Sequence, residues 1–95
     1  MKYTFSSKLW KSNGNGGWYF MSLPELMSKE IRTHLQWQEE GWGRLKANAK
    51  IKNLQWETAI WFDTKTKTYL LPIKAVIRKK LNLEIDNLLE VEIFI

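Results

Sequence analysis

The segment YFMSLPELMSKEIRTHL, residues 19–35, changes from strand-like to helical spacing at a Leu-Pro pair. Before the pair, aromatic and apolar residues follow one another as they do in a strand. After it, side chains recur at i, i+4, i+7 and i+8 on one helix face, at Met27, Ile31, His34 and Leu35. Pro24 suits the first helical turn, because the N–H that it lacks would have no partner there. The segment therefore predicts a strand followed by a short helix.

A second segment, TYLLPIKAVIRKKLNL at residues 68–83, follows the same order, with its Leu-Pro pair ending at Pro72. Its helical face comprises Ile73, Val76, Ile77 and Leu81. Both segments contain Ile-Arg-x-x-Leu, although proline and isoleucine are seven positions apart in the first and five in the second. Each half of the chain reads strand, strand, Leu-Pro, helix, strand. This order predicts a pseudo-twofold internal repeat, β-β-α-β twice, and the alternative is a chance similarity of two short amphipathic segments.

Period-two alternation predicts the rest of the secondary structure. From Leu45 to Lys52, apolar side chains alternate with lysine and asparagine, which indicates a half-buried strand with a basic outer face. The expected strands are residues 3–11, 18–23, 45–52, 55–62, 68–71 and 88–95, and TKTKT at 64–68 is a polar, hairpin-like connection. The predicted fold is a mainly β, small barrel of about six strands with two short α-helices, in a single domain spanning residues 1–95.

The composition limits the classes of function. The chain has 95 residues, of which 44% are hydrophobic and 26% charged, as in an ordinary globular domain. It has no cysteine, which excludes disulfides, thiolate catalysis and Cys-based zinc sites. Neither a run of about 18 apolar residues nor a signal-peptide core is present, so we expect a cytoplasmic protein without membrane contact, metal or cofactor. The net charge of +5 favours anionic partners, and six tryptophans suggest that one or two reach a surface.

Three motifs resemble the bacterial family of unknown function DUF1905. They are WKSNGNGGWYFMSLP at 10–24, GWGRLKANAKIKNLQWETAIWF at 41–62 and YLLPIKAVIRKKLNL at 69–83. The resemblance covers essentially the whole chain and implies a double-split β-barrel, distantly similar to AbrB- and MazE-type DNA-binding proteins. Those proteins build the barrel from two chains. The resemblance implies no established activity, ligand or catalytic residue.

One departure from the family pattern lies before the last strand, where Asp86-Asn87 stands in place of Gly-Asp. Asp and Asn tolerate left-handed backbone better than most residues, so we expect the turn to persist.

The glycine-rich stretch SNGNGGWYFMSLP, residues 12–24, raises the question of a phosphate-binding loop. Such loops open onto a helix N-terminus, whereas here the glycines lead into the strand pattern that begins at Trp18. A flexible hairpin connection, in which Asn and Gly supply positive φ, fits better. A loop that touches a ligand or a nucleic-acid backbone is the alternative, because Lys8 and Lys11 lie close by.

Cations gather in the second half of the chain. We expect a nucleic-acid-binding face formed by Lys65, Lys67, Lys74 and Arg78. The alternative is an ordinary solvated helix face. Trp37 and Trp42 flank a polar connection and could stack on bases or sugars, or cap the open end of the barrel.

Catalytic signals are weak in this sequence. His34 is the only histidine, and its place on the apolar helix face indicates packing or a local hydrogen bond rather than a metal site. No serine has a recognisable nucleophile context, although a carboxylate pair could be assembled in space from Glu25, Glu30, Glu57 or Asp63.

The sequence therefore favours a non-enzymatic, monomeric binding module for nucleic acid or another anionic partner. The alternative is a small-ligand or protein-interaction domain with a tryptophan-lined site at the barrel mouth. An enzyme comes third.

Overall fold

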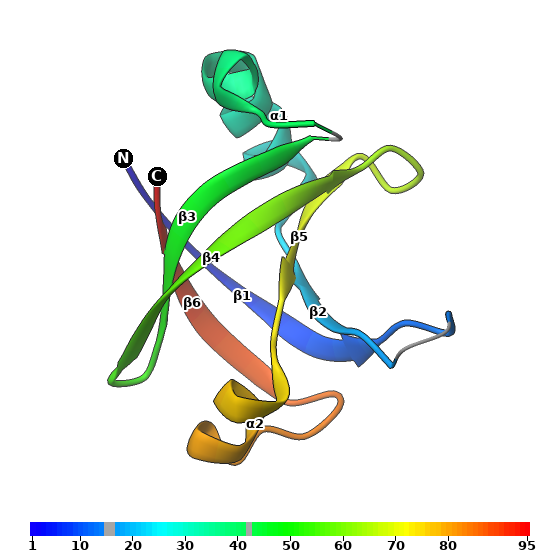
Figure 1. Ribbon diagram of the computed structural model, residues 1–95, viewed down its shortest axis with the longest axis vertical. Helices are drawn as coiled ribbons and strands as arrows, with labels where there is room; N and C mark the ends of the chain where they lie inside the picture. The colour runs from blue at the N-terminus through cyan, green and yellow to red at the C-terminus, as the bar shows by residue number, and fades with distance from the viewer. Residues whose placement is uncertain (15–16, 42) are drawn as a thin grey trace.

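A closed antiparallel barrel forms the body of the protein (Figure 1). The computed structural model describes residues 1–14, 17–41 and 43–95. Its elements are β1 (Lys2–Lys11), β2 (Tyr19–Ser22), α1 (Glu25–Leu35), the 3₁₀ turn η1 (Gln36–Gln38), β3 (Arg44–Ile51), β4 (Leu54–Asp63), β5 (Thr68–Pro72), α2 (Ala75–Leu81) and β6 (Leu88–Phe94). The six strands join in the order β1-β2-β5-β4-β3-β6, and β6 pairs with β1. The predicted fold, a mainly β barrel of about six strands with two short helices, is confirmed.

Alternation along each strand separates the core from the outer wall. Leu9, Met21 and Leu71 occupy paired positions on β1, β2 and β5, and all three are fully buried. Burying one such side chain contributes about 1.5–3 kcal/mol. The core therefore fixes the strand register, because a slip of one residue would turn these side chains to solvent. On β3 the same alternation buries Leu45 and Ile51 and leaves a basic outer face, as the sequence predicts.

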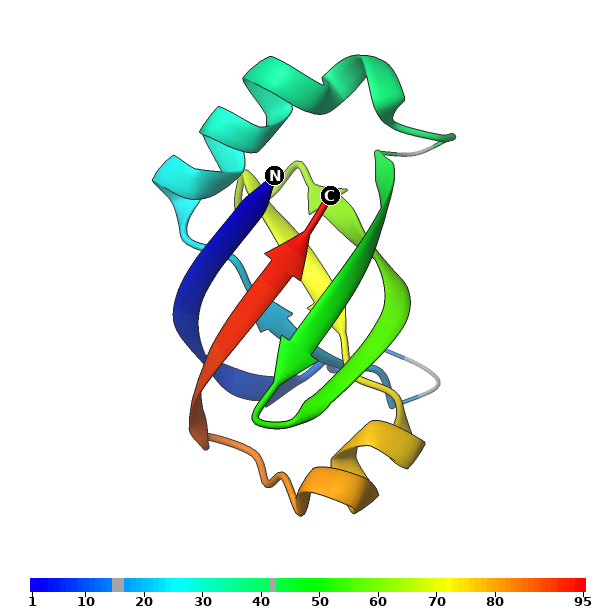
Figure 2. The same ribbon diagram turned by 90° about the vertical axis from the view of Figure 1, so that its left-hand side faces the viewer.

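The two helices cover opposite ends of the barrel, α1 at the top of Figure 2 and α2 at the bottom. α1 buries Ile31 and Leu35, and the Ser28 hydroxyl accepts the backbone N–H of Tyr69 on β5 at 3.0 Å. α2 buries Ile77. Both helices are too short to persist without these contacts. Among the described residues, no helix is long and apolar enough to cross a membrane.

The two Leu-Pro pairs occupy different places, which corrects one sequence prediction. Pro24 is the N-cap residue of α1, as expected, but Pro72 is the last residue of β5 and is buried opposite Phe20. The strand pairing determines the different positions of the two prolines. Leu23 N–H donates to Tyr69 O at 2.9 Å, and Ile73 N–H donates to Tyr19 O at 2.8 Å. Leu23 and Ile73 are therefore the equivalent positions. Pro72 precedes α2 without opening it.

The predicted internal repeat is compatible with the barrel. The chain order β1-β2-α1-β3 followed by β4-β5-α2-β6 contains the same series of elements twice. The circular strand order is also unchanged when β1, β2 and β3 exchange places with β4, β5 and β6. An ancestral duplication stays a prediction, since element order alone does not distinguish it from independent origin.

Candidate functional site

The outer wall of the barrel carries a groove of about 710 Å³. Trp61 on β4 lies opposite Arg44 on β3, and Lys46 follows Arg44 on the same face. Trp18 and Lys74 reach the groove from the segments just before β2 and just after β5. We use the name Trp groove for the surface formed by Trp18, Arg44, Lys46, Trp61 and Lys74.

Both tryptophans of the Trp groove present their rings to solvent, with 56% of Trp18 and 40% of Trp61 exposed. Trp18 lies nearly parallel to Phe20, with ring centroids 6.2 Å apart. Phe20 packs in turn on Trp10 at 5.2 Å, and the Trp10 indole N–H donates to Ser22 Oγ at 2.9 Å. Neighbouring aromatic rings thus support the exposed ring of Trp18, so the ring is positioned before any partner arrives.

The charges around the Trp groove are unevenly compensated. Arg44 Nη1 donates to Glu40 Oε1 at 2.8 Å, and its guanidinium carbon lies 5.8 Å from the centroid of the Trp61 ring. Lys46 and Lys74 make no ion pair among the described residues. Glu57 supplies the one carboxylate of the groove lining. The groove lining therefore carries two ammonium groups without an ion pair and one acidic side chain, beside two exposed rings.

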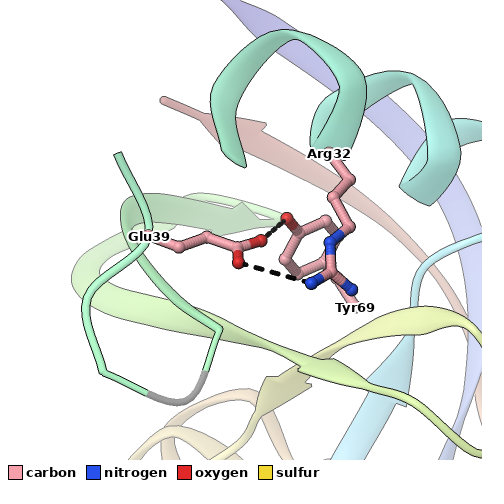
Figure 3. A network of polar contacts seen from close by, with 3 residues as sticks. All are labelled: Arg32, Glu39 and Tyr69. Carbon is pink, nitrogen blue, oxygen red and sulfur yellow. Dashed lines mark hydrogen bonds and ion pairs between the residues drawn. The ribbon is translucent and has the colours of Figure 1, made fainter. Parts of the chain in front are cut away.

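A second polar cluster lies at the α1 end of the barrel and joins Arg32, Glu39 and Tyr69 (Figure 3). The Tyr69 hydroxyl donates to Glu39 Oε2, and Arg32 Nη2 lies 3.8 Å from Glu39 Oε1. The Arg32 guanidinium carbon lies 3.8 Å from the ring centroid of Phe62. The cluster ties the segment after η1 to β5 and to α1.

The environment of Tyr69 favours its protonated form. Burial raises the pKa of the Tyr69 hydroxyl well above its usual range, and the hydrogen bond to Glu39 and the Glu39 charge raise it further. A neutral hydroxyl that donates to a carboxylate forms a stabilising hydrogen bond and does not act as a nucleophile. In the described part of the chain, no three His, Asp or Glu side chains are arranged to hold a metal ion.

A family model described as "Domain of unknown function (DUF1905)" matches residues 5–93. The chain belongs to the DUF1905 family. This confirms the resemblance seen in the three sequence motifs, while the relation to AbrB- and MazE-type proteins stays a prediction. The comparison with curated proteins gives no match.

The DUF1905 barrel does not bring the four predicted cations onto one face, which corrects that expectation. Lys65 and Lys67 lie in the β4–β5 turn near α1, whereas Lys74 and Arg78 lie at α2, beyond the other end of β5 (Figure 1). Arg78 Nη1 donates to Ile73 O at 2.6 Å, and the guanidinium stacks on Tyr19. The length of β5 separates the two pairs, and of the four only Lys74 lines the Trp groove.

The capping alternative for Trp37 is wrong, whereas a ligand-binding role for Trp37 stays a prediction. Trp37 lies in η1 with 79% of its surface exposed, and its indole N–H donates to His34 O at 3.0 Å. It therefore does not cap the barrel, because Leu35 and the rest of the buried face of α1 already fill that end. The prediction for Trp42 lies outside the described residues.

His34 is exposed, contrary to the predicted packing role. The buried face of α1 follows Ser28, Ile31 and Leu35, at i, i+3 and i+7, rather than the spacing that includes His34. Ile31 and Leu35 belong to both faces, but His34 lies about 100° around the helix from Leu35 and falls outside the arc that Ser28, Ile31 and Leu35 occupy.

The glycine-rich stretch joins two antiparallel strands, as predicted for a hairpin. β1 pairs with β2, and Ser12 N–H donates to Trp18 O at 2.8 Å where the strands leave the turn. Gly17 has a φ of +62°, which glycine adopts without strain. The prediction for Gly16 lies outside the described residues.

The Asp86-Asn87 turn is present as expected. Asp86 has a φ of +70°, and the Asn87 side-chain oxygen accepts Glu84 N–H at 2.8 Å.

The predicted carboxylate candidates lie on two elements, Glu25 and Glu30 on α1 and Glu57 and Asp63 on β4. The Asp63 carboxylate accepts Lys65 N–H at 3.2 Å and the Thr66 hydroxyl at 2.8 Å, so it stabilises its own turn. Glu25 lies at the start of α1 and Glu57 lines the Trp groove on the wall of the barrel.

Sequence reasoning missed Trp18 and Trp61 as a pair. A signal was present for Trp61, which shares its strand register with the polar residues Gln55 and Glu57 and therefore belongs to the outer face. Its proximity to Trp18 depends on the pairing of β4 with β5 and of β5 with β2. Such pairing between distant segments cannot be read from the alternation of one strand.

Proposed function

We propose that this DUF1905 barrel is a non-enzymatic module that binds single-stranded nucleic acid in the Trp groove. The observation that carries the proposal is the placement of two exposed tryptophan rings, one of them stacked on Phe20, beside the ammonium groups of Lys46 and Lys74. Stacking on such rings gives about 1–3 kcal/mol per base and tolerates any sequence, because every base has a π-face. The lysines would neutralise backbone phosphates.

The exposed rings favour a single strand over a duplex. In a duplex the base faces are stacked on one another, so a tryptophan side chain has no face to contact without unstacking a step. Duplex binding by a module of this kind would use phosphate contacts or groove readout. Of the side chains that commonly read base edges, the described groove lining contains Arg44, which is paired with Glu40, and Asn48. The expected ligand is therefore an unpaired strand of mixed sequence.

A small aromatic or sugar ligand is the second candidate for the same surface. The groove volume of about 710 Å³ falls within the range of small-molecule sites, roughly 300–1,000 Å³. This candidate predicts binding that depends on the rings and is almost independent of salt, since a neutral ligand releases no counterions.

Titration with oligothymidylate, followed by intrinsic tryptophan fluorescence, tests the proposal. Two neutralised phosphates on a single strand give a slope of about −1.4 for log affinity against log salt. Between about 50 and 200 mM salt the affinity should then fall about sevenfold. No binding at the lower salt concentration would remove nucleic acid from consideration.

Charge reversal provides the matched comparison. The double variant Lys46→Glu, Lys74→Glu should bind at least about fivefold more weakly at low salt and lose most of the salt dependence. Lys79→Glu, Lys80→Glu changes the net charge equally at exposed positions of α2 that do not line the groove. Equal losses in the two double variants would mean that only the overall charge acts, and would contradict binding in the Trp groove.

A further inference from the structure

A second hollow lies at the α1 end of the barrel, between the helix and the β4–β5 turn. Its volume is about 460 Å³, within the range of small-molecule sites. One side is a face of α1 that carries Lys29 and Arg32, and the opposite side is formed by Phe62 on β4 and Lys67 in the turn. No residue of the Trp groove lines this hollow, which we call the α1 pocket.

Arg32 is the central cation of the α1 pocket. Stacking on Phe62 fixes the orientation of its guanidinium. Arg32 Nη2 lies 3.8 Å from Glu39 Oε1, which is too long for a hydrogen bond (Figure 3). The other two arginines both donate short hydrogen bonds, Arg44 to Glu40 at 2.8 Å and Arg78 to Ile73 O at 2.6 Å. Among the described residues, the Arg32 guanidinium makes no such bond. Its fork of N–H donors is therefore oriented but still available for an anion.

The remaining charges of the α1 pocket strengthen this preference. Lys29 and Lys67 make no ion pair among the described residues, and Glu25 is the single carboxylate of the lining. Three cations and one anion leave a local excess of two positive charges, the difference between those counts. The Glu39 carboxylate offsets part of the Arg32 charge, but Tyr69 shares that carboxylate through its hydroxyl.

The pocket also has an apolar component. The Phe62 ring contributes to the lining, and Leu26, on the α1 side of the pocket, has 82% of its surface exposed. An isolated phosphate or chloride ion would make no apolar contact with the carbons of Phe62 and Leu26. We propose that the α1 pocket binds a small organic anion, a carboxylate or phosphate monoester that carries an aromatic or apolar group. The acid group would meet Arg32, Lys29 and Lys67, and the apolar group would lie against Phe62 and Leu26.

Phenyl phosphate is a suitable probe, followed by ¹H–¹⁵N NMR on the intact protein. Saturable shifts should concentrate at the backbone amides of residues 25–36, at Phe62 and at Lys67. A parallel titration with benzoate distinguishes the two acid groups, and binding of either one supports the proposal. Benzyl alcohol, the uncharged comparison, should bind at least about tenfold more weakly. Absence of saturable shifts with both acids, or shifts centred on Trp18 and Trp61, would overturn the proposal.

Two glycine variants of the turn test the role of the cation. Lys67 has a φ of +58°, a conformation that glycine adopts readily, so Lys67→Gly removes the ammonium group while preserving the turn. Its affinity for phenyl phosphate should fall at least about threefold. Lys65→Gly removes a neighbouring charge that does not line the pocket, and its affinity should stay within about a factor of two. Equal weakening in both variants would contradict a specific site.

The α1 pocket and the Trp groove share no lining residue. Lys67→Gly should leave oligothymidylate binding in the Trp groove unchanged, so either proposal can fail without the other.

Discussion

At the scale of single residues, the buried hydroxyl of Tyr69 has the clearest physical consequence. Tyr69 is fully buried, and its hydroxyl satisfies a Glu39 side chain of which only 9% is exposed. Losing the phenol would leave that carboxylate with one distant partner, Arg32. A buried charged acceptor without a hydrogen bond is costly, whereas the aromatic ring itself could be kept by phenylalanine.

The raised pKa of Tyr69 predicts a loss of stability at alkaline pH. Its ordinary value is 10.0, so above about pH 10 the unfolded chain releases a proton that the folded chain retains. The free energy of unfolding should therefore fall with rising pH, by up to about 1.4 kcal/mol per pH unit for this group. Urea denaturation between about pH 8 and pH 11 measures the effect.

Tyr69→Phe is the comparison for this prediction. The variant should be less stable by about 1–3 kcal/mol near neutral pH, because Glu39 loses its donor. Its stability should then decline less steeply above pH 10 than that of the wild type. Burial and the Glu30 charge raise the pKa of Tyr3 as well, so part of the decline should persist in the variant. Parallel curves for the two proteins would show that Tyr69 ionises alike in both states.

At the scale of elements, a buried hydrogen bond to Ser28 adds to the apolar face in holding α1 against the barrel. Ser28 is fully buried, and its hydroxyl accepts the Tyr69 N–H at 3.0 Å. Ser28→Ala should destabilise the protein by about 1–3 kcal/mol, since that N–H would have no acceptor in the core. Thr33→Ala, at an exposed position of the same helix, should change stability by less than about 0.5 kcal/mol. Thermal unfolding followed by circular dichroism compares the two, and similar midpoints would contradict the docking role of Ser28.

The elements also show how far sequence reasoning extends. Alternation along Leu45–Ile51 and the hairpin residues before Trp18 predict strands and their connection correctly, because burial of one face is a local property of the pattern. The role of Pro72 was predicted wrongly, because pairing with β2 extends β5 through Pro72. The predicted packing role of His34 was wrong for a related reason, because tertiary contacts determine which of two possible helix faces is buried.

For the candidate sites, distance along the chain does not predict which side chains lie together. Lys65 and Lys74 are close in sequence, yet β5 places them toward opposite ends of the barrel. Trp18 and Trp61 are far apart in sequence, and two strand pairings bring them to one groove. The net positive charge predicts an attraction for anions. Which of the charged side chains share one surface depends on the barrel topology.

At the scale of the whole molecule, the closed barrel predicts a monomer. The described strands form a continuous circle, so the barrel offers no unpaired edge strand to a second copy. Light scattering should give a mass near 11.4 kDa at micromolar concentration. A stable dimer would show that another surface, such as the exposed apolar side chains of Leu26 or Leu88, has a self-association role.

The central claim concerns the Trp groove, and the indole N–H signals of the six tryptophans test it most directly. In ¹H–¹⁵N spectra, assigned with single Trp→Phe variants, an oligothymidylate of about eight nucleotides, within the range of single-strand sites, is added stepwise. Stacking of bases in the groove predicts that the signals of Trp18 and Trp61 shift together and saturate. The signal of Trp37, which is exposed but does not line the groove, should stay in place. A spectrum in which Trp18 and Trp61 do not move, or move no more than Trp37, would contradict the account.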